Sequence, residues 1–512
     1  GPMVLGTSSD KLSDKPIFTI TPTPATQLYD PYPLIGINKA HFVGLHTTSY
    51  SAEGIAPQIY FEWYIGVNPG ETRHEMHSSS DPGPINVQAL EESITMFVAR
   101  HSHFRSYVTH TGQMQTLDYF PKYKITHVYS GASTNDDAVL EAAEDAAIAT
   151  RAEMTANGPD VHSWPLFEFR VTHMGTSKSI VHVTISLFLM DAMGDLIFRQ
   201  ELSAIYRAVK KFHEENVDQT LPRRRLLDEA VLKHLPVASK LAFRDYSQAV
   251  DVQLPLSDEF LRAKKFWLSR VATFPSGPDL PLVLTREQGK ASGRFSNQHR
   301  WMSATEWKNA QVNCATHFVT VPAMLLAAYS LVIARWSRNQ HFLLNILQCL
   351  RHQVHPDVNK TVGNCSSTIL CEIDMTPPVS KAGDRKRLTS ITLLEAIQRV
   401  GKELSCNLEH ACMSGVEVMQ EVNRMKGNTF QAVAPFIFTT PIGVEKGNAQ
   451  VQTRDWIFNE RFFSEKVPHT ACVNAIKADP SGKACASMDI VEGVFPTEVV
   501  EGIHRTYCEL ID

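Results

Sequence analysis

Apolar residues recur along the chain with two different periods, and both periods occur in each half of it. Spacings of three and four residues predict helices, and strict alternation or a short apolar run predicts strands. The predicted helices cover residues 87–101, 136–155, 194–209, 257–271, 304–317, 321–336, 393–408 and 496–510. The predicted strands cover residues 113–119, 167–173, 180–190, 341–350, 435–440 and 484–491. Because strands and helices interleave in both halves, the pattern favours two α/β lobes over a helix bundle or a β-sandwich.

Two stretches lack these patterns and divide the chain. Residues 1–28 are rich in Ser, Thr, Pro and Asp and are predicted to form a flexible lead-in. Residues 211–230 are charged and contain Pro222, so we interpret them as a linker between lobes 29–210 and 231–512. Gly1-Pro2 ahead of Met3 resembles what tag removal leaves behind, which favours Met3 as the native start of a free-standing protein.

Composition narrows the function classes. The 512 residues carry a formal net charge of −5, which argues against a partner bound through its phosphates, such as a nucleic acid. No apolar run of about 18 residues predicts a membrane span, and the N-terminus lacks a secretory pattern. The nine cysteines form no C-x-x-C pair, which favours reduced thiols and no metal site. We therefore expect a cytoplasmic, monomeric protein without metal.

Nine separated segments match the motifs of one family in the same order. The longest match runs from Val321-Pro322-Ala323 through Ala334-Arg335-Trp336-Ser337 to Phe342-Leu343-Leu344-Asn345. The others include Tyr32-Pro33-Leu34 with Ala40 to Gly44, Arg100 to Arg105, Phe243-Arg244-Asp245-Tyr246, Gly363 to Ser367, Pro435 to Thr440, Gln452-Thr453 with Phe458-Asn459, and Met488-Asp489 with Val491 to Pro496. From about residue 28 to its end, the chain resembles the heterocyclization domains of the condensation-domain superfamily, which serve nonribosomal peptide assembly.

This resemblance implies an architecture and a substrate. The fold would be α/β (α+β), with two chloramphenicol-acetyltransferase-like lobes in a V-shaped pseudo-dimer around a central tunnel. The partners would be a carrier protein or an acyl or aminoacyl thioester, on phosphopantetheine, and a small-molecule intermediate. No cofactor is expected beyond that thioester substrate.

The family's signature falls at the end of the strand predicted over 180–190. Amide-forming members carry H-H-x-x-x-D-G there, and heterocyclization members carry D-x-x-x-x-D-x-x-S. This chain has Ser186 where the first Asp would be, Leu187 where the amide-forming His would be, and Gly194 at the closing Ser. A leucine cannot take up a proton, so histidine-driven condensation is excluded. Asp191 keeps the second acidic position, where the family's Asp braces the lobes through an ion pair; a helix N-cap is the other interpretation.

The family's ring-closing residues are only partly kept. Dehydration is attributed there to a Thr and an Asp; Thr439 matches the first, and Asn459 replaces the second. A carboxamide has no proton to exchange near pH 7. Asn364 and Ser366 likewise replace an Asp and a Thr. The residues predicted to bind substrate are Ser186, Asn364, Ser366, Thr440 and Gln452.

New reactive side chains stand at other family positions. His41 replaces a Tyr and His103 a Met; either could be a general base, or a buried histidine that backbone groups satisfy. Cys365 replaces an aromatic residue, and packing is favoured over a nucleophilic role.

Three functions compete at this point. The first is a stand-alone condensation- or cyclization-type enzyme that joins or closes a thioester-held substrate with Thr439, Asn459 and His41 or His103. The second is a cyclase that works by shape, through a pericyclic or aldol-like closure of a free intermediate. The third is a non-catalytic domain that only binds carrier proteins.

Overall fold

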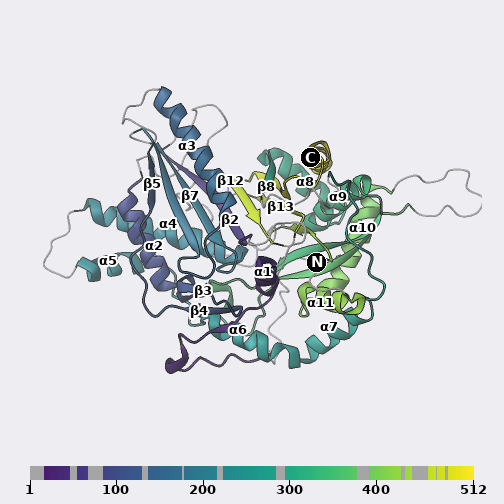
Figure 1. The fold of residues 1–512 in the computed structure, drawn as a ribbon, viewed down its shortest axis with the longest axis horizontal. Helices are drawn as coiled ribbons and strands as arrows, with labels where there is room; N and C mark the ends of the chain where they lie inside the picture. Colours follow the sequence, from purple (N-terminus) through teal and green to yellow (C-terminus); the bar gives the residue numbers. More distant parts are fainter. Residues whose placement is uncertain are drawn as a thin grey trace, which may run out of the picture.

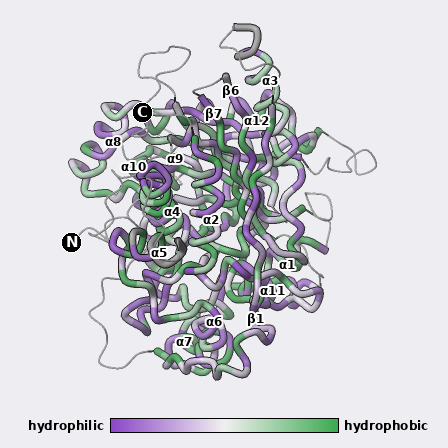
Figure 2. Tube along the Cα trace, turned by 90° about the vertical axis from the view of Figure 1, so that its left-hand side faces the viewer, coloured by the Kyte–Doolittle hydropathy of each residue, from purple (hydrophilic) through white to green (hydrophobic). Residues whose placement is uncertain are grey.

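The computed structural model describes residues 17–46, 55–66, 85–129, 137–175, 178–215, 223–283, 294–377, 391–427, 433–440, 459–468, 470–478 and 482–512. Figure 1 shows two lobes side by side, each built on one large sheet with helices against it. In Figure 2 hydrophobic and hydrophilic residues lie mixed along the chain, as expected when helices and strands bury one face.

The first lobe is built on a five-stranded sheet with the order β12-β2-β7-β6-β5. Its strands are β2 (Gln58–Ile65), β5 (Thr126–Tyr129), β6 (Phe167–Met174), β7 (Lys178–Ser186) and β12 (Asn459–Lys466). Helices α2 (Val87–Arg100) and α4 (Ala192–Glu214) pack together on one face, where Phe198 stacks with Trp63 of β2. Helix α3 (Asp137–Ala156) covers the other face, and its Arg151 pairs with the buried Glu62 at 2.6 Å.

The second lobe is built on a six-stranded sheet with the order β10-β9-β11-β13-β14-β8. Its strands are β8 (Phe295–Met302), β9 (His341–Cys349), β10 (Ser366–Asp374), β11 (Phe436–Thr439), β13 (Cys472–Ala478) and β14 (Ala484–Val491). Its helices are α8 (Ala304–Thr316), α9 (Val321–Trp336), α10 (Leu393–Leu408), α11 (Gly415–Lys426) and α12 (Thr497–Ile511). Tyr329 of α9 lies against Phe438 and Cys472, so this face of the sheet is covered by helices.

Smaller elements connect the lobes. A three-stranded sheet holds β1 (Tyr32–Pro33), β3 (Ser106–Val108) and β4 (Gln113–Thr116), and α5 (Arg223–Leu232), α6 (Phe243–Val252) and α7 (Asp258–Leu268) follow the first lobe. Helix α1 (Ile37–Leu45) belongs to the first lobe by sequence but contacts β10 and α11 of the second.

The lobes also share a strand. Although β12 follows most of the second lobe in sequence, it pairs antiparallel with β2 of the first lobe, from Asn459 opposite Tyr64 to Lys466 opposite Gln58. In Figure 1 the yellow β12 arrow lies beside β2. The lobes are therefore not two consecutive, independent stretches of chain.

Most of the predicted elements are confirmed, and the helices over 321–336 and 393–408 have the predicted bounds. The strand predicted over 180–190 was too long: β7 ends at Ser186, because the backbone then turns and the Leu189 N–H donates to the Ser186 carbonyl at 3.0 Å. Within the described residues no single helix is long and apolar enough to cross a membrane.

Two segments predicted to lack structure are packed where the structure describes them. In the predicted lead-in, Phe18 is buried and its ring lies against those of Tyr246 and His352. In the predicted linker, α5 begins and buries Leu227, and it continues into the second lobe's range, where it buries Val231; the helix contacts α4. A few apolar residues, too few to set a visible period, are enough to anchor each segment.

Candidate functional site

The signature segment, Ser186 to Gly194, lies where β7 ends and α4 begins. Asp191 is the N-cap of α4: its Oδ1 accepts a hydrogen bond from the Gly194 N–H at 2.7 Å. The preceding turn, Leu187 to Met190, is buried. The site is therefore held on a rigid strand–turn–helix junction.

Asp191 pairs with Arg351, which follows β9 in the other lobe. Nη2 of Arg351 lies 2.7 Å from Oδ1 of Asp191, and Nε lies 3.2 Å from Oδ2. Oδ2 also accepts from the Cys365 N–H and from the Cys349 thiol. Burial acts to lower the pKa of Arg351, but the Asp191 carboxylate raises it well above its ordinary value. This geometry supports the predicted bracing role of Asp191, and the N-cap interpretation holds at the same time.

The guanidinium of Arg351 is fully engaged. Its Nη1 donates to the carbonyls of Val358 at 2.6 Å and Thr361 at 2.7 Å. A buried charge of this kind is tolerated only when both the opposite charge and the remaining donors are satisfied.

Asn364 and Ser186, which stand where the family has Asp, both make hydrogen bonds that suit their own side chains. Nδ2 of Asn364 donates to the Leu187 carbonyl at 2.5 Å and to Oδ1 of Asn38 at 3.2 Å, and its Oδ1 accepts from the Ser366 N–H. An ionised Asp at 364 could not donate either of the first two bonds. The hydroxyl of Ser186 donates to the Pro57 carbonyl at 3.2 Å. Ser186, Asn364 and Ser366 are all buried, and their predicted contact with substrate remains a prediction.

Both predicted histidines lie against the signature turn through Phe188. The His41 ring meets the Phe188 ring edge-on with centroids 5.9 Å apart, and Nε2 of His103 donates to the Phe188 carbonyl at 3.1 Å. Nδ1 of His103 accepts from the Tyr32 hydroxyl at 2.9 Å, so both of its nitrogens are used. Burial lowers the pKa of His41 to about 3 and that of His103 to about 4. Both rings are therefore neutral at pH 7, and the geometry favours packing for His103.

Helix α1 carries two buried polar atoms without a partner in the part of the chain that is described. They are Nδ1 of His41 and Nδ2 of Asn38, one turn apart on the same helix. Because unpaired buried polar atoms are costly, each of these two atoms needs a partner from outside the described residues, such as an ordered water or a ligand.

Thr439 lies on the sheet face that looks toward the first lobe. It is the last residue of β11 and stands between Leu347 of β9 and Ala475 of β13, all three strands running parallel. Side chains on one face of a strand recur every two residues, so Cys349, which bonds Asp191, shares this face with Thr439. Thr439 is half-buried, and its hydroxyl has no hydrogen-bond partner among the described residues. The structure thus brings Thr439 and the Asp191 brace to the same end of one sheet.

The remaining predicted residues are Thr440, Asn459, Gln452 and Cys365, and the structure describes only some of their side chains. The Thr440 hydroxyl donates to the Ile476 carbonyl at 3.2 Å. Asn459 begins β12, but its side chain lies outside what the structure describes, and so does the whole of Gln452. Cys365 is buried and burial raises the pKa of its thiol to about 12, which supports packing over nucleophilic attack.

Sequence reasoning missed three residues near this site: Arg351, Cys349 and Lys477. Arg351 and Cys349 reach Asp191 from far along the chain, and no local pattern marks them. Lys477 had a signal, since it is the only charged residue in the strand Cys472–Ala478.

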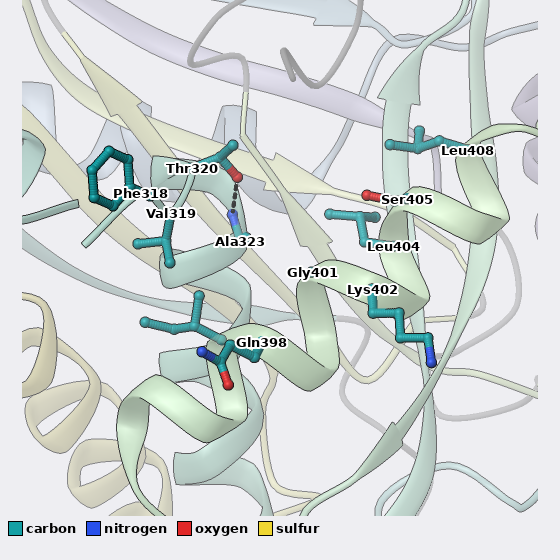
Figure 3. Close-up of a pocket in the computed structure, with 11 residues that line it drawn as sticks. Phe318, Val319, Thr320, Ala323, Gln398, Gly401, Lys402, Leu404, Ser405 and Leu408 are labelled. Atoms are coloured by element: carbon teal, nitrogen blue, oxygen red, sulfur yellow. Dashed lines mark hydrogen bonds between the residues drawn. The ribbon is translucent and has the colours of Figure 1, made fainter. Parts of the chain in front are cut away.

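A separate pocket of about 240 Å³ lies elsewhere in the second lobe, between the start of α9 and one side of α10. Figure 3 shows Thr320, Ala323, Gly401 and Leu404 around it, and no predicted site residue lines it. Among the described residues no group of three or more His, Cys, Asp or Glu side chains is arranged to hold a metal.

The fold and the site define a two-lobed α/β protein whose polar residues converge where β7, β9 and β11 end between the lobes. The family model for the condensation domain matches residues 225–511, more than half of the chain. The chain belongs to the condensation-domain family.

Similar proteins and structures agree with this placement. Bacitracin synthase 1 of Bacillus licheniformis is 23% identical over 94% of this chain but only 8% of its own length. Phenyloxazoline synthase MbtB of Mycobacterium sp. (strain MCS) is 24% identical over 81% of this chain and 30% of its own length. The chain thus spans less than a third of these relatives.

Among solved structures, the EpoB cyclization-docking bidomain of Sorangium cellulosum matches with a TM-score of 0.72 and 21% identity, covering 97% of this chain and 87% of its own. The X-domain from teicoplanin biosynthesis matches with a TM-score of 0.65 and 13% identity, covering 97% and 96%. At these identities the likeness shows the fold. The predicted family and the α/β, acetyltransferase-like fold class are confirmed.

Proposed function

We propose that this chain is a condensation- or heterocyclization-type enzyme of natural-product biosynthesis that forms a bond or ring without the usual histidine. Its substrate is an acyl or aminoacyl thioester on a carrier protein, or a small-molecule intermediate. The observation that carries the proposal is Thr439: a hydroxyl without a partner in the described part of the chain, at the end of β11 and on the face that holds the Asp191 brace.

The site suits a reaction that depends on position and hydrogen bonds. Holding two reactants in a productive geometry supplies a large part of many rate enhancements, and fixed donors stabilise charge that develops on a carbonyl oxygen. The Thr439 hydroxyl is available as such a donor. The rigid junction at Asp191 and the complementary contacts of Asn364 keep the surrounding backbone in place.

The match between Asn364 and its surroundings also speaks against a domain that has lost all function. Random loss of acidic residues would leave poorly matched polar groups, whereas Asn364 satisfies two acceptors and one donor. We therefore favour a catalytic role over a domain that only binds carriers.

A shape-driven cyclase is the second candidate, and the neutral histidines favour it. With pKa values of about 3 and 4, His41 and His103 are neutral at pH 7 and are both weak acids and weak bases. Such a site suits the closure of a free intermediate better than proton-dependent transfer.

One experiment separates these candidates. The protein is incubated with a phosphopantetheinyl carrier protein that bears an acyl or aminoacyl group, and separately with the same acyl group as a free acid. Loss of the acyl mass from the carrier in intact-mass spectrometry, with a matching product, supports the first proposal. Turnover of the free compound alone supports the cyclase, and carrier binding without turnover in either assay contradicts both.

Thr439→Ala is expected to lower turnover by about tenfold or more, because it removes a donor to developing negative charge. Thr439→Ser keeps the hydroxyl and is expected to retain most of the rate, and Thr316→Ala, at the exposed end of α8, serves as the control. Steady-state rates of the three variants, with circular dichroism to confirm folding, make the comparison. Equal rates for Thr439→Ala and the unmodified protein would remove Thr439 from the mechanism.

A further inference from the structure

Lys477 lies on the same sheet face as Thr439, one strand away. Thr439 pairs with Ala475 of β13, and Lys477 is two residues further along that strand, toward the carboxyl ends of the parallel strands. The opposite face is the one covered by helices, because Cys472 of β13 bonds Tyr329 of α9.

The ammonium of Lys477 lies between the two lobes. Its Nζ is 2.9 Å from the centre of the Phe463 ring on β12, the strand that joins the first lobe's sheet. On its other side β14 places Cys485 directly opposite it in the ladder. Lys477 is half-buried, so its amine is neither sealed in a core nor on an open surface.

Two of the carboxylates near Lys477 are held by another cation, Arg199. Glu460 of β12 pairs with Arg199 at 2.6 Å, and Asp195 of α4 pairs with the same Arg199 at 2.9 Å. Within the described residues, Nζ of Lys477 has neither an ion-pair partner nor a hydrogen-bond acceptor. The face of the Phe463 ring is its contact within these residues, so its N–H groups remain available to a reactant.

The surroundings also make the amine easier to deprotonate. Burial lowers the pKa of Lys477, Arg199 lowers it further, and Glu460, Asp195 and Glu465 oppose the shift without reversing it. Near neutral pH, Glu465 opposes the lowering of the Lys477 pKa only weakly. Burial raises the pKa of Glu465 itself to about 7, so its carboxyl group is then partly protonated and uncharged. Lysines tuned in this way serve as general bases in other enzymes.

We propose that Lys477 is a catalytic residue of this site, the group that exchanges protons with the reactants beside Thr439. The proposal rests on the proposed thioester chemistry. The neutral amine accepts the proton of an attacking N–H, O–H or S–H group as the new bond to the acyl carbon forms. The carbon–sulfur bond then breaks, and the ammonium returns the proton to the departing thiolate, so that one acyl product and one free thiol result.

The first test needs no turnover. The folded, full-length protein is treated with 2,4,6-trinitrobenzenesulfonate between pH 6 and 10, and the labelling of each lysine is followed by peptide mass spectrometry. Lys477 is expected to react with a midpoint below that of free Nα-acetyl-lysine in the same buffers. A midpoint for Lys477 at or above that of free Nα-acetyl-lysine, or no labelling at all, overturns the proposal.

The second test uses turnover and two variants. Lys477→Met and Lys477→Arg are both expected to lower the rate by roughly 100-fold or more, because neither can exchange a proton near neutral pH. Lys477→Arg keeps the charge, so a loss in this variant cannot be explained by a missing cation. In the unmodified protein the rate is expected to rise with pH as the Lys477 amine loses its proton. This rise should be absent from the pH profiles of the two variants.

The outcomes of the two tests separate the two proposals. If the unmodified protein turns over no thioester but Lys477 labels early, the proposed function fails while the reactive amine stands. If turnover is normal in Lys477→Arg and its pH profile is unchanged, Lys477 has no catalytic role even though the enzyme is active.

Discussion

Replacing Asp191 with alanine is expected to lower the free energy of unfolding by about 3–5 kcal/mol, the usual cost of leaving one member of a buried ion pair alone. The guanidinium of Arg351 would keep its three carbonyl acceptors but lose both bonds to the carboxylate. The N-cap of α4 would be lost as well, which typically costs about 1 kcal/mol. Urea denaturation followed by fluorescence measures the change.

The matched control is Asp251→Ala. Asp251 also pairs with a cation far away in sequence, Lys39 at 2.9 Å, but both side chains are partly exposed. An exposed pair contributes about 0–1 kcal/mol, so this variant should unfold almost like the unmodified protein. If Asp191→Ala is equally stable but inactive, Asp191 is a catalytic group and the bracing role is wrong.

Local pattern predicted the helices well for a physical reason. Helix α9 is apolar over most of its surface and begins at a Thr cap with Pro in its first turn, and α10 begins with a capping box between Thr392 and Glu395. These signals lie within a few residues of each other, so they can be read from sequence. Both helices have the predicted bounds.

Pairings between distant parts of the chain could not be predicted in the same way. Nothing local marks β12 as a strand of the first lobe's sheet, since its partner β2 lies some 400 residues earlier in the printed sequence. The same holds for Arg351, whose contact with Asp191 defines the brace. The family resemblance located Asp191 and Thr439, but only the register shows that they lie at one end of one sheet.

The strand register also shows which residue could replace the missing acidic groups as a proton carrier. Taken as a sequence, Ser186, Asn364 and Asn459 suggest that the site has lost its proton carriers. In the structure a lysine that the family motifs do not include stands on the Thr439 face, and a buried glutamate lies close to it. We infer that proton exchange has moved to another strand.

Glu465→Gln is expected to stabilise the protein at pH 8 by up to about 3 kcal/mol and to change its stability by less than about 0.5 kcal/mol at pH 4.5. Burial raises the pKa of Glu465 to about 7, from an ordinary value of 4.5. Between pH 4.5 and about pH 7 the unfolded chain has released this proton while the folded protein keeps it. The stability of the unmodified protein therefore falls as the pH rises through this range. Each unit of pKa difference corresponds to about 1.4 kcal/mol. Glutamine mimics the protonated acid and removes this penalty.

Glu460→Gln is the control, on the same strand but with the opposite expectation. Glu460 pairs with the buried Arg199, so removing its charge leaves a buried guanidinium with one partner fewer and should lower stability at pH 8. Thermal unfolding of both variants at pH 4.5, 6 and 8 provides the comparison. If Glu465→Gln destabilises the protein at pH 8 as Glu460→Gln does, then Glu465 is ionised in the folded state. Its carboxylate would then stabilise the ammonium of Lys477, and the amine would titrate higher than the proposed proton exchange requires.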